Sequence, residues 1–126
     1  MSKLKRVGLF LGLVLMIAIN QSCKNDNPSI IKIFLRSSSN ELVVGGKVVI
    51  IGDINSNPAT NAYVDTLVTN NSGYVAFNMD DYFAAAGPDN TVGYYDIVAK
   101  ANSKTGYGTV RARVHTTAVE TVYLPN

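Results

Sequence analysis

The stretch TGYGTVRARVH, residues 105–115, alternates apolar and polar side chains more regularly than any other part of the 126-residue chain. Successive side chains of a β-strand point to opposite faces, so this pattern predicts a strand with one buried face. The face expected to meet the core carries Val110, Ala112 and Val114. The face expected to meet solvent carries Arg111, Arg113 and His115. The stretch therefore favours a β fold whose sheets are covered on one side.

The same period of two returns along the chain from Ser29 onward, interrupted by clusters of Gly, Asn, Ser and Pro. Seven strands are expected, within residues 30–36, 41–52, 62–69, 74–79, 93–101, 105–115 and 119–124. The inward-facing side chains expected in two of them are Ile31, Ile33, Leu35, Tyr95, Ile97 and Ala99. The pair Gly45-Gly46 is expected to mark a bulge or a tight reversal. The turn NNSG at 70–73 is expected to join 62–69 and 74–79 as a hairpin.

One segment, NMDDYFAAAGP at 78–88, has helical signals instead. Asn78 is a candidate N-cap, and Gly87 with Pro88 are stop signals. Asp80 and Asp81 are adjacent carboxylates, which an acid–base pair could also supply. Neighbouring helical residues point in different directions, and first-turn acids complement the helix dipole, so capping is the preferred interpretation. The expected fold is therefore all-β, a seven-stranded antiparallel sandwich with one short helix, over residues 30–126.

Three stretches resemble transthyretin-like (prealbumin-like) and carboxypeptidase-regulatory-like domains. KIFLRSSSNELVVGGKVVIIG, at 32–52, is similar to their opening strand, turn and apolar-x-Gly step. TLVTNNSGYVAFNM, at 66–79, resembles their second hallmark, and YDIVA, at 95–99, resembles the tyrosine-led strand that follows. The resemblance covers about residues 30–124, and it implies a β-sandwich used for support, assembly or binding rather than for catalysis.

The first 22 residues have the composition of a secretory signal peptide. Lys3, Lys5 and Arg6 precede thirteen residues, VGLFLGLVLMIAI, that carry no charge. A membrane-spanning helix needs about 20 apolar residues, so the shorter run favours a cleaved leader. Without the leader, eight basic residues remain against nine acidic ones. This balance predicts that nucleic acid is not a partner.

Cys23 is the only cysteine and lies among Gln21, Ser22, Lys24 and Asn25. A structural thiol would be expected in an apolar segment, and a catalytic thiol would need a histidine partner. The stretch INQSC resembles the lipobox of bacterial lipoproteins, which implies a lipid on Cys23. Residues 23–29 are then a polar tether, and the protein is expected to be lipid-anchored in the outer membrane. The sequence is compatible with a position on either the periplasmic face or the outer face of that membrane.

Other candidate sites have simpler interpretations. Asp53, Asn55 and Asn57 have the spacing of a calcium loop, but Pro58 and Val64 replace the Gly and Glu that such a loop needs. A polar surface loop is preferred, and no metal or cofactor is predicted. His115 is the only histidine, and the chain has no nucleophile motif, so an enzyme is not predicted. An enzyme would need a pocket lined by Asp80, Asp81 or His115.

The basic stripe formed by Arg111, Arg113 and His115 is the candidate partner-facing site, although a solvated strand face explains it more simply. The expected function is that of an outer-membrane lipoprotein acting as a non-catalytic accessory or structural subunit of a cell-envelope assembly. By analogy of architecture, transthyretin-like lipoproteins occur in contractile secretion machines. The alternative is a stand-alone surface module that binds a glycan or a protein. A subunit should expose an apolar patch or a strand edge, whereas a receptor should carry a concave aromatic site.

Overall fold

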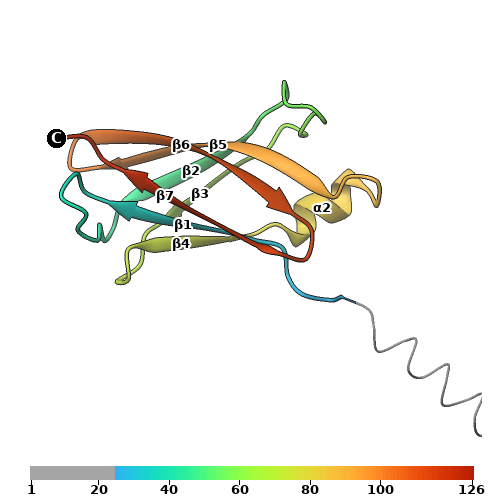
Figure 1. Cartoon of the computed structure of the whole chain (residues 1–126), viewed down its shortest axis with the longest axis horizontal. Coiled ribbons are helices and arrows are strands. Elements are labelled where there is room, and N and C mark those ends of the chain that lie inside the picture. The colour runs from blue at the N-terminus through green and yellow to red at the C-terminus, as the bar shows by residue number, and fades with distance from the viewer. Residues whose placement is uncertain (1–24) are drawn as a thin grey trace, which may run out of the picture.

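The computed structural model describes residues 25–126, which form two β-sheets packed face to face with one short helix at one end (Figure 1). The predicted all-β sandwich of seven strands and one helix is confirmed. Its elements, in chain order, are β1 (Ile30–Arg36), β2 (Lys47–Gly52), β3 (Val64–Val68), β4 (Tyr74–Asn78), α2 (Asp80–Ala86), β5 (Val92–Ala101), β6 (Lys104–Arg113) and β7 (Thr117–Tyr123).

The three-stranded sheet has the order β4-β1-β7, and the four-stranded sheet has the order β3-β2-β5-β6. All neighbours are antiparallel except β1 and β7, which run parallel with Ile30 opposite Thr117 and Arg36 opposite Tyr123. The first and last strands of the domain therefore lie side by side. The helix α2 lies at the end of the sandwich where the N-terminal segment leaves, and the C terminus lies at the opposite end (Figure 1).

The alternating residues of the central strands supply the core between the sheets. The predicted inward faces of β1 and β5 are confirmed, because all six of their side chains are buried. In β6, Val110 and Ala112 are buried as expected, and Val114 packs against the core from just beyond the strand. The remaining core members are Val43, Val48, Ile50, Val75, Phe77, Met79, Tyr82, Phe83, Val122 and Leu124.

The predicted hairpin of 62–69 with 74–79 is wrong. Strand β3 pairs with β2, and β4 pairs with β1 in the other sheet, so the 69–73 turn carries the chain from one sheet to the other. Thr69 is buried at this crossing, where its hydroxyl donates to the Val43 carbonyl (2.7 Å) and accepts from the Gly46 amide (2.9 Å). These bonds attach the crossing to the segment before β2.

The second expected strand, 41–52, is shorter in the structure and starts at Lys47. Gly45 has a φ of +76°, a conformation that glycine adopts readily, so the predicted reversal is confirmed at this position. At Gly46, an added Cβ would lie 2.4 Å from the Leu35 side chain. The glycine pair therefore lets the chain pass close to β1 before it enters the other sheet.

The helix α2 has Asp80 and Asp81 in its first turn and Gly87 at its C-terminal end, as expected. Asn78 is not the N-cap, since Met79 occupies that position. The Asn78 side chain still accepts a bond from the Asp80 amide (2.9 Å), so it satisfies a free donor of the first turn. The side chains of Tyr82 and Phe83 are buried against the sandwich.

Candidate functional site: the groove at the N-terminal junction

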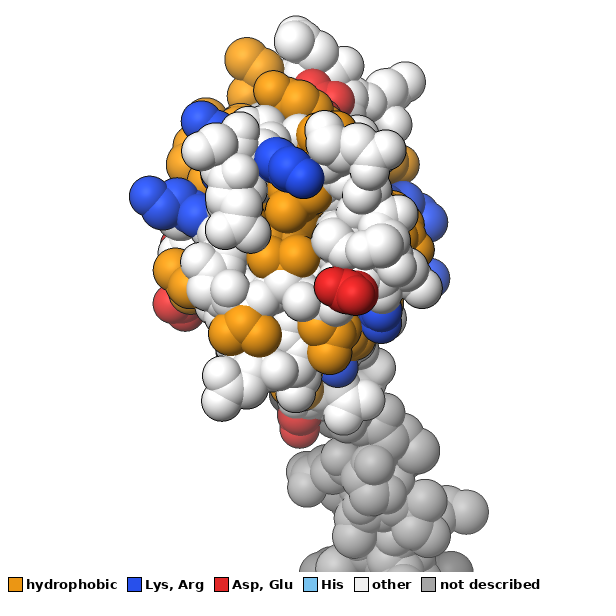
Figure 2. Space-filling model, turned by 90° about the vertical axis from the view of Figure 1, so that its left-hand side faces the viewer, with side chains coloured by type: hydrophobic (Ala, Val, Ile, Leu, Met, Phe, Trp, Pro, Cys, Tyr) orange, Lys and Arg blue, Asp and Glu red, His pale blue; other side chains and the backbone are white. Residues whose placement is uncertain are grey.

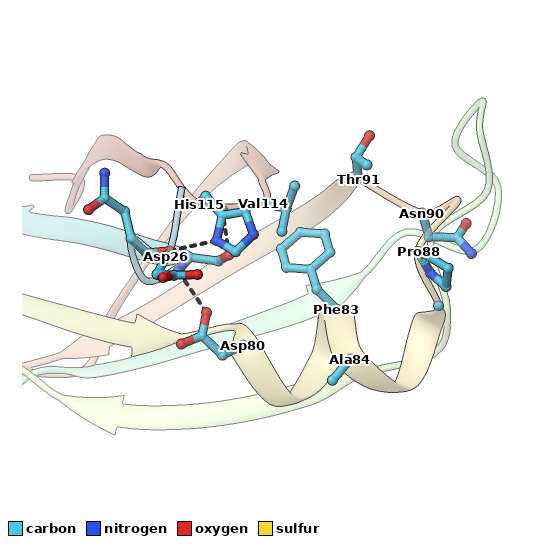
Figure 3. A pocket seen from close by; sticks show the side chains of 12 residues that line it. Asp26, Asp80, Phe83, Ala84, Pro88, Asn90, Thr91, Val114 and His115 are labelled. Carbon is cyan, nitrogen blue, oxygen red and sulfur yellow. Dashed lines mark hydrogen bonds between the residues drawn. The ribbon is translucent and has the colours of Figure 1, made fainter. Parts of the chain in front are cut away.

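A hollow lies where the N-terminal segment meets the end of the sandwich (Figure 3). It is a groove of about 670 Å³ between the 26–29 segment, α2, the 87–91 loop and the turn after β6. Its lining residues are Asp26, Asn27, Ser29, Asp80, Phe83, Ala84, Gly87, Pro88, Asn90, Thr91, Val114 and His115. Figure 3 shows Phe83 and Val114 on one side of the groove, and Asp80 and His115 on the side of the N-terminal segment.

Ser29 is the centre of the junction and is almost completely buried. Its amide donates to Asp80 Oδ1 (2.8 Å), and its hydroxyl accepts from the His115 amide (2.8 Å). Its carbonyl accepts from the Met79 amide (2.7 Å). Each polar group of Ser29 therefore has a partner on α2 or on the turn after β6.

The imidazole of His115 extends this set of bonds to Asn27. Its Nδ1 lies 2.7 Å from the Asn27 carbonyl oxygen, and a carbonyl only accepts, so Nδ1 carries the proton. We call Asn27, Ser29, Asp80 and His115 the junction clamp. Because the clamp begins at Asn27, the predicted tether differs from the structure in its last residues, which are fixed to the domain.

His115 does not lie on the strand stripe that the alternation predicted. Strand β6 ends at Arg113, and His115 has a φ of +61° in the following turn, which rotates its side chain towards the N-terminal segment. Arg111 and Arg113 are exposed on the outer face of β6, as expected. The structure therefore separates the histidine from the two arginines.

The groove brings Asp80 and His115 together, but not Asp81. Both side chains bond to the backbone of the N-terminal segment, so these bonds hold the segment in place. The groove contains no cysteine, and its one serine hydroxyl accepts the His115 amide bond. Among residues 25–126, no group of three or more His, Cys, Asp or Glu side chains could hold a metal ion.

An aromatic cluster of Tyr63, Tyr82, Phe83 and Tyr95 lies behind the groove. Its rings pack edge to face, with centroids 5.2 to 6.3 Å apart. The Tyr82 hydroxyl accepts from the Asn61 amide (3.0 Å), which attaches the 54–63 loop to α2. The buried Tyr95 hydroxyl has no hydrogen-bond partner among the described residues. Burial raises the pKa of Tyr95 and Tyr63, and the carboxylate of Asp65 adds to the increase at Tyr63.

The loop with calcium-like spacing is held by its own atoms. Asp53 Oδ1 accepts from the Asn55 amide (3.0 Å), and the Asp53 carbonyl accepts from the Ser56 hydroxyl (2.8 Å). The Ser56 and Thr60 hydroxyls are 3.0 Å apart, and Thr60 accepts from the Tyr94 amide (2.8 Å). These bonds support the interpretation of this segment as a structured polar loop.

Arg111 lines a second, smaller hollow of about 440 Å³ beside the open edge between β6 and β7. The hollow also contains three carboxylates, those of Asp53, Asp96 and Glu120. Glu120 lies opposite Ile33 on the inward side of β7. A charged side chain that points inward from an edge strand disfavours pairing with another chain.

The sequence did not indicate the clamp, because Asn27 and Ser29 belong to a polar stretch whose composition is typical of a tether.

No protein-family model and no curated protein matches this chain. Residues 1–22 and Cys23, the predicted signal peptide and lipid site, lie outside the described residues. Between residues 25 and 126, no helix has the length and apolar content needed to cross a membrane.

Proposed function

We propose that this chain is an outer-membrane lipoprotein, anchored through a lipid on Cys23, whose β-sandwich is a non-catalytic accessory or structural subunit of a cell-envelope assembly. The two-sheet fold with one short helix is compatible with the transthyretin-like resemblance. The observation that carries the proposal is the junction clamp. It attaches Asn27 and Ser29, which follow the proposed lipid site closely, to the end of the β-sandwich.

The clamp sets how far the domain can lie from its anchor. Asn27, which makes the first clamp bond, is the fourth residue after Cys23, the site of the proposed lipid. Four extended residues span at most about 14 Å. A domain held this close has one end at the lipid surface and its long sides available to neighbouring proteins, which suits a subunit of an envelope assembly.

Two polar side chains of the groove have a structural role. Asp80 Oδ1 accepts from the Ser29 amide, and His115 Nδ1 donates to the Asn27 carbonyl. Both bonds hold the N-terminal segment against the end of the sandwich, which supports a structural role for this junction.

The exposed surface distinguishes a subunit from a receptor. Five apolar side chains meet on the outer face of the four-stranded sheet, which we call the outer patch: Val49, Ile51, Val64, Val98 and Tyr107. Val64 is 66% exposed and Tyr107 is 75% exposed. The groove, in contrast, has one phenyl ring, that of Phe83, which is 6% exposed. The outer patch borders a hollow of about 530 Å³ lined by Ile51, Val98 and Tyr107, and an exposed apolar surface of this kind favours a protein neighbour.

Hydrophobic side chains are also exposed at the end of the sandwich that carries the C terminus, among them Leu42, Val44 and Tyr123. Figure 2 looks onto this end and shows hydrophobic side chains with polar atoms and charged side chains between them. The outer patch is the candidate contact on the long side of the sandwich.

The first test is whether Cys23 carries lipid and whether the lipidated protein has a partner. The full chain with a C-terminal tag and its Cys23→Ala variant would be expressed in cells fed a palmitate analogue. We expect label and outer-membrane fractionation for the wild type only. Gentle detergent extraction should then recover envelope proteins in fixed ratio with the wild type.

The alternative function is a stand-alone surface module for a glycan or protein ligand, and the groove of about 670 Å³ is the observation that favours it. A labelled wild type that is recovered alone would contradict the subunit proposal. A glycan array probed with the same protein would then test the alternative, with Phe83→Ala as the variant expected to lose binding. An unlabelled Cys23 would contradict both versions.

A further inference from the structure

The outer face of the four-stranded sheet has an unfavourable charge arrangement at one end. Lys47 on β2 and Lys100 on β5 are direct cross-strand partners, and both are exposed. Side chains directly opposite each other on one face have Cβ atoms about 5 Å apart, and like charges there destabilise the sheet. The domain therefore holds two ammonium groups together on an exposed surface.

The row next to this lysine pair has three apolar residues beside Thr66 of β3. Val49 lies opposite Val98, and Val98 lies opposite Tyr107 on β6. The following row places Val64 and Ile51 beside Asp96. Rows on one face of a strand are about 7 Å apart, so the lysine pair directly borders the outer patch.

The other end of the same face is also basic, because Arg111 and Arg113 lie opposite Tyr94 and Val92. Within the four described strands, Asp96 is the acidic side chain on this outer face, and Asp53 follows directly after β2. Arg111 shares its hollow with carboxylates, so the lysine pair carries the stronger uncompensated charge. The four strands span about 19 Å across the face, and β5 and β6 extend about 30 Å along it.

The opposite outer face covers its aromatic rings with its own cation. Lys32 Nζ lies 4.2 Å from the centroid of the Tyr74 ring and 5.1 Å from that of Phe34. Lys32 therefore lies over the Phe34 and Tyr74 rings, whereas Val119 and Tyr123 on the same face are each 55% exposed. On the four-stranded face neither the lysine pair nor the outer patch has such a contact.

We propose that the lysine pair and the outer patch together form the docking surface for a protein partner that presents a carboxylate beside apolar side chains. The inference rests on the proposed function and specifies the partner of that subunit. A carboxylate placed between Lys47 and Lys100 would remove their repulsion, and apolar partner side chains would cover Val98 and Tyr107. A polyanion without apolar groups would leave the patch exposed. A second copy docked symmetrically would bring four lysines together.

The test combines crosslinking with a charge change. A photo-crosslinking residue would replace Tyr107 in the full lipidated chain, and Tyr123, which is 55% exposed on the other sheet, would be the matched control position. We expect crosslinks from position 107 to an envelope protein, at a peptide that contains Asp or Glu next to apolar residues. Position 123 should give no such product.

Two charge variants distinguish an effect on partner binding from an effect on the stability of the fold. Lys100→Gln should lower the yield of the crosslink about tenfold and leave the thermal midpoint unchanged or higher, because it relieves the repulsion with Lys47. Lys104→Gln removes the same charge four residues away, outside the outer face, and should change neither quantity. Loss of the crosslink together with a lower midpoint would instead indicate damage to the fold and overturn the inference.

Other outcomes also overturn the inference. Crosslinks to a second copy would assign the face to self-association, and crosslinks to lipid would assign it to the membrane. A partner that is recovered with the wild type but crosslinks only from position 123 would leave the proposed function standing and refute this docking surface. Absence of any partner from the labelled wild type would refute both.

Discussion

Thr69 shows how one hydroxyl can hold the crossing between two sheets. It donates to the Val43 carbonyl and accepts from the Gly46 amide, and all three groups lie away from solvent. Buried backbone groups that lose a partner keep their full desolvation penalty. A residue that no strand pattern singles out therefore fixes how the chain passes between the layers.

Thr69→Val should lower the free energy of unfolding by about 2 to 4 kcal/mol, because valine has the same shape and leaves two backbone groups unpaired. Chemical denaturation of the detergent-solubilised chain would measure the change. Thr66→Val is the matched control, since Thr66 is exposed on β3, which ends just before Thr69, and it should stay within about 0.5 kcal/mol of the wild type. Equal effects of the two substitutions would contradict the role given to Thr69.

Tyr95 presents the opposite case, a buried hydroxyl without a partner among the described residues. Tyr95→Phe removes that hydroxyl and keeps the ring contacts with Tyr63 and Tyr82. We expect the free energy of unfolding to stay the same or to rise by up to about 1 kcal/mol. A clear loss of stability would show that the hydroxyl has a partner of its own.

The same residue makes stability depend on alkaline pH. Burial raises the pKa of Tyr95 in the folded chain, so the unfolded chain loses this proton first, near its ordinary value of about 10. The stabilisation is present below about pH 10 and is lost as the pH rises above that value. Denaturation midpoints measured between neutral pH and about pH 11 should fall less steeply for Tyr95→Phe than for the wild type.

For the strands, the sequence predicted which side chains face the core, but it did not predict which strands pair with one another. Alternation is local, because each side chain faces opposite to its neighbour, so the buried faces of β1, β5 and β6 could be predicted. The choice of sheet is not local. The turn at 70–73 suits a hairpin by composition, yet β3 and β4 pair with strands from elsewhere in the chain.

The prediction for His115 failed for a related reason. The alternation continues to residue 115, but the strand ends at Arg113 because the chain turns there towards β7. The left-handed φ of His115 then directs its side chain to the N-terminal segment. The candidate site at the junction could not be predicted, since it depends on three segments that meet only in the folded domain.

The junction clamp can be tested through α2. Asp80→Ala removes the acceptor of the Ser29 amide, whereas Asp81→Ala changes the neighbouring carboxylate, which is exposed in the same helical turn. We expect hydrogen exchange at the amides of Ser29 and Ile30 to become at least about tenfold faster in Asp80→Ala, an effect of about 1.4 kcal/mol on local opening. Asp81→Ala should leave both amides protected, and equal protection in the two variants would refute the clamp.

For the whole molecule, the clamp and a lipid on Cys23, as proposed above, would together fix an orientation at the membrane. The end with α2 and the 87–91 loop should face the lipid surface, and the β5–β6 turn at 102–103 should point away from it. This arrangement keeps the long sides of the sandwich, including the outer patch, free of the bilayer.

The orientation can be measured because the proposed lipid would occupy the only native cysteine. Single cysteines introduced as Asp89→Cys and Ser103→Cys can each be labelled with a fluorophore in the lipidated chain bound to vesicles. A headgroup-attached quencher should reduce the signal at position 89 much more than at position 103. Equal quenching at both positions would mean that the domain lies flat or moves freely about its anchor.

The parallel pairing of β1 with β7 affects when the three-stranded sheet can be completed during folding. The middle strand of the three-stranded sheet gains its second neighbour only from residues 117–123, far along the chain from β1. Contacts between such distant segments form late, because a long loop must close before they contribute. A chain that has emerged only as far as β6 therefore leaves one edge of β1 unpaired, and the sheet is completed only when residues 117–123 join it.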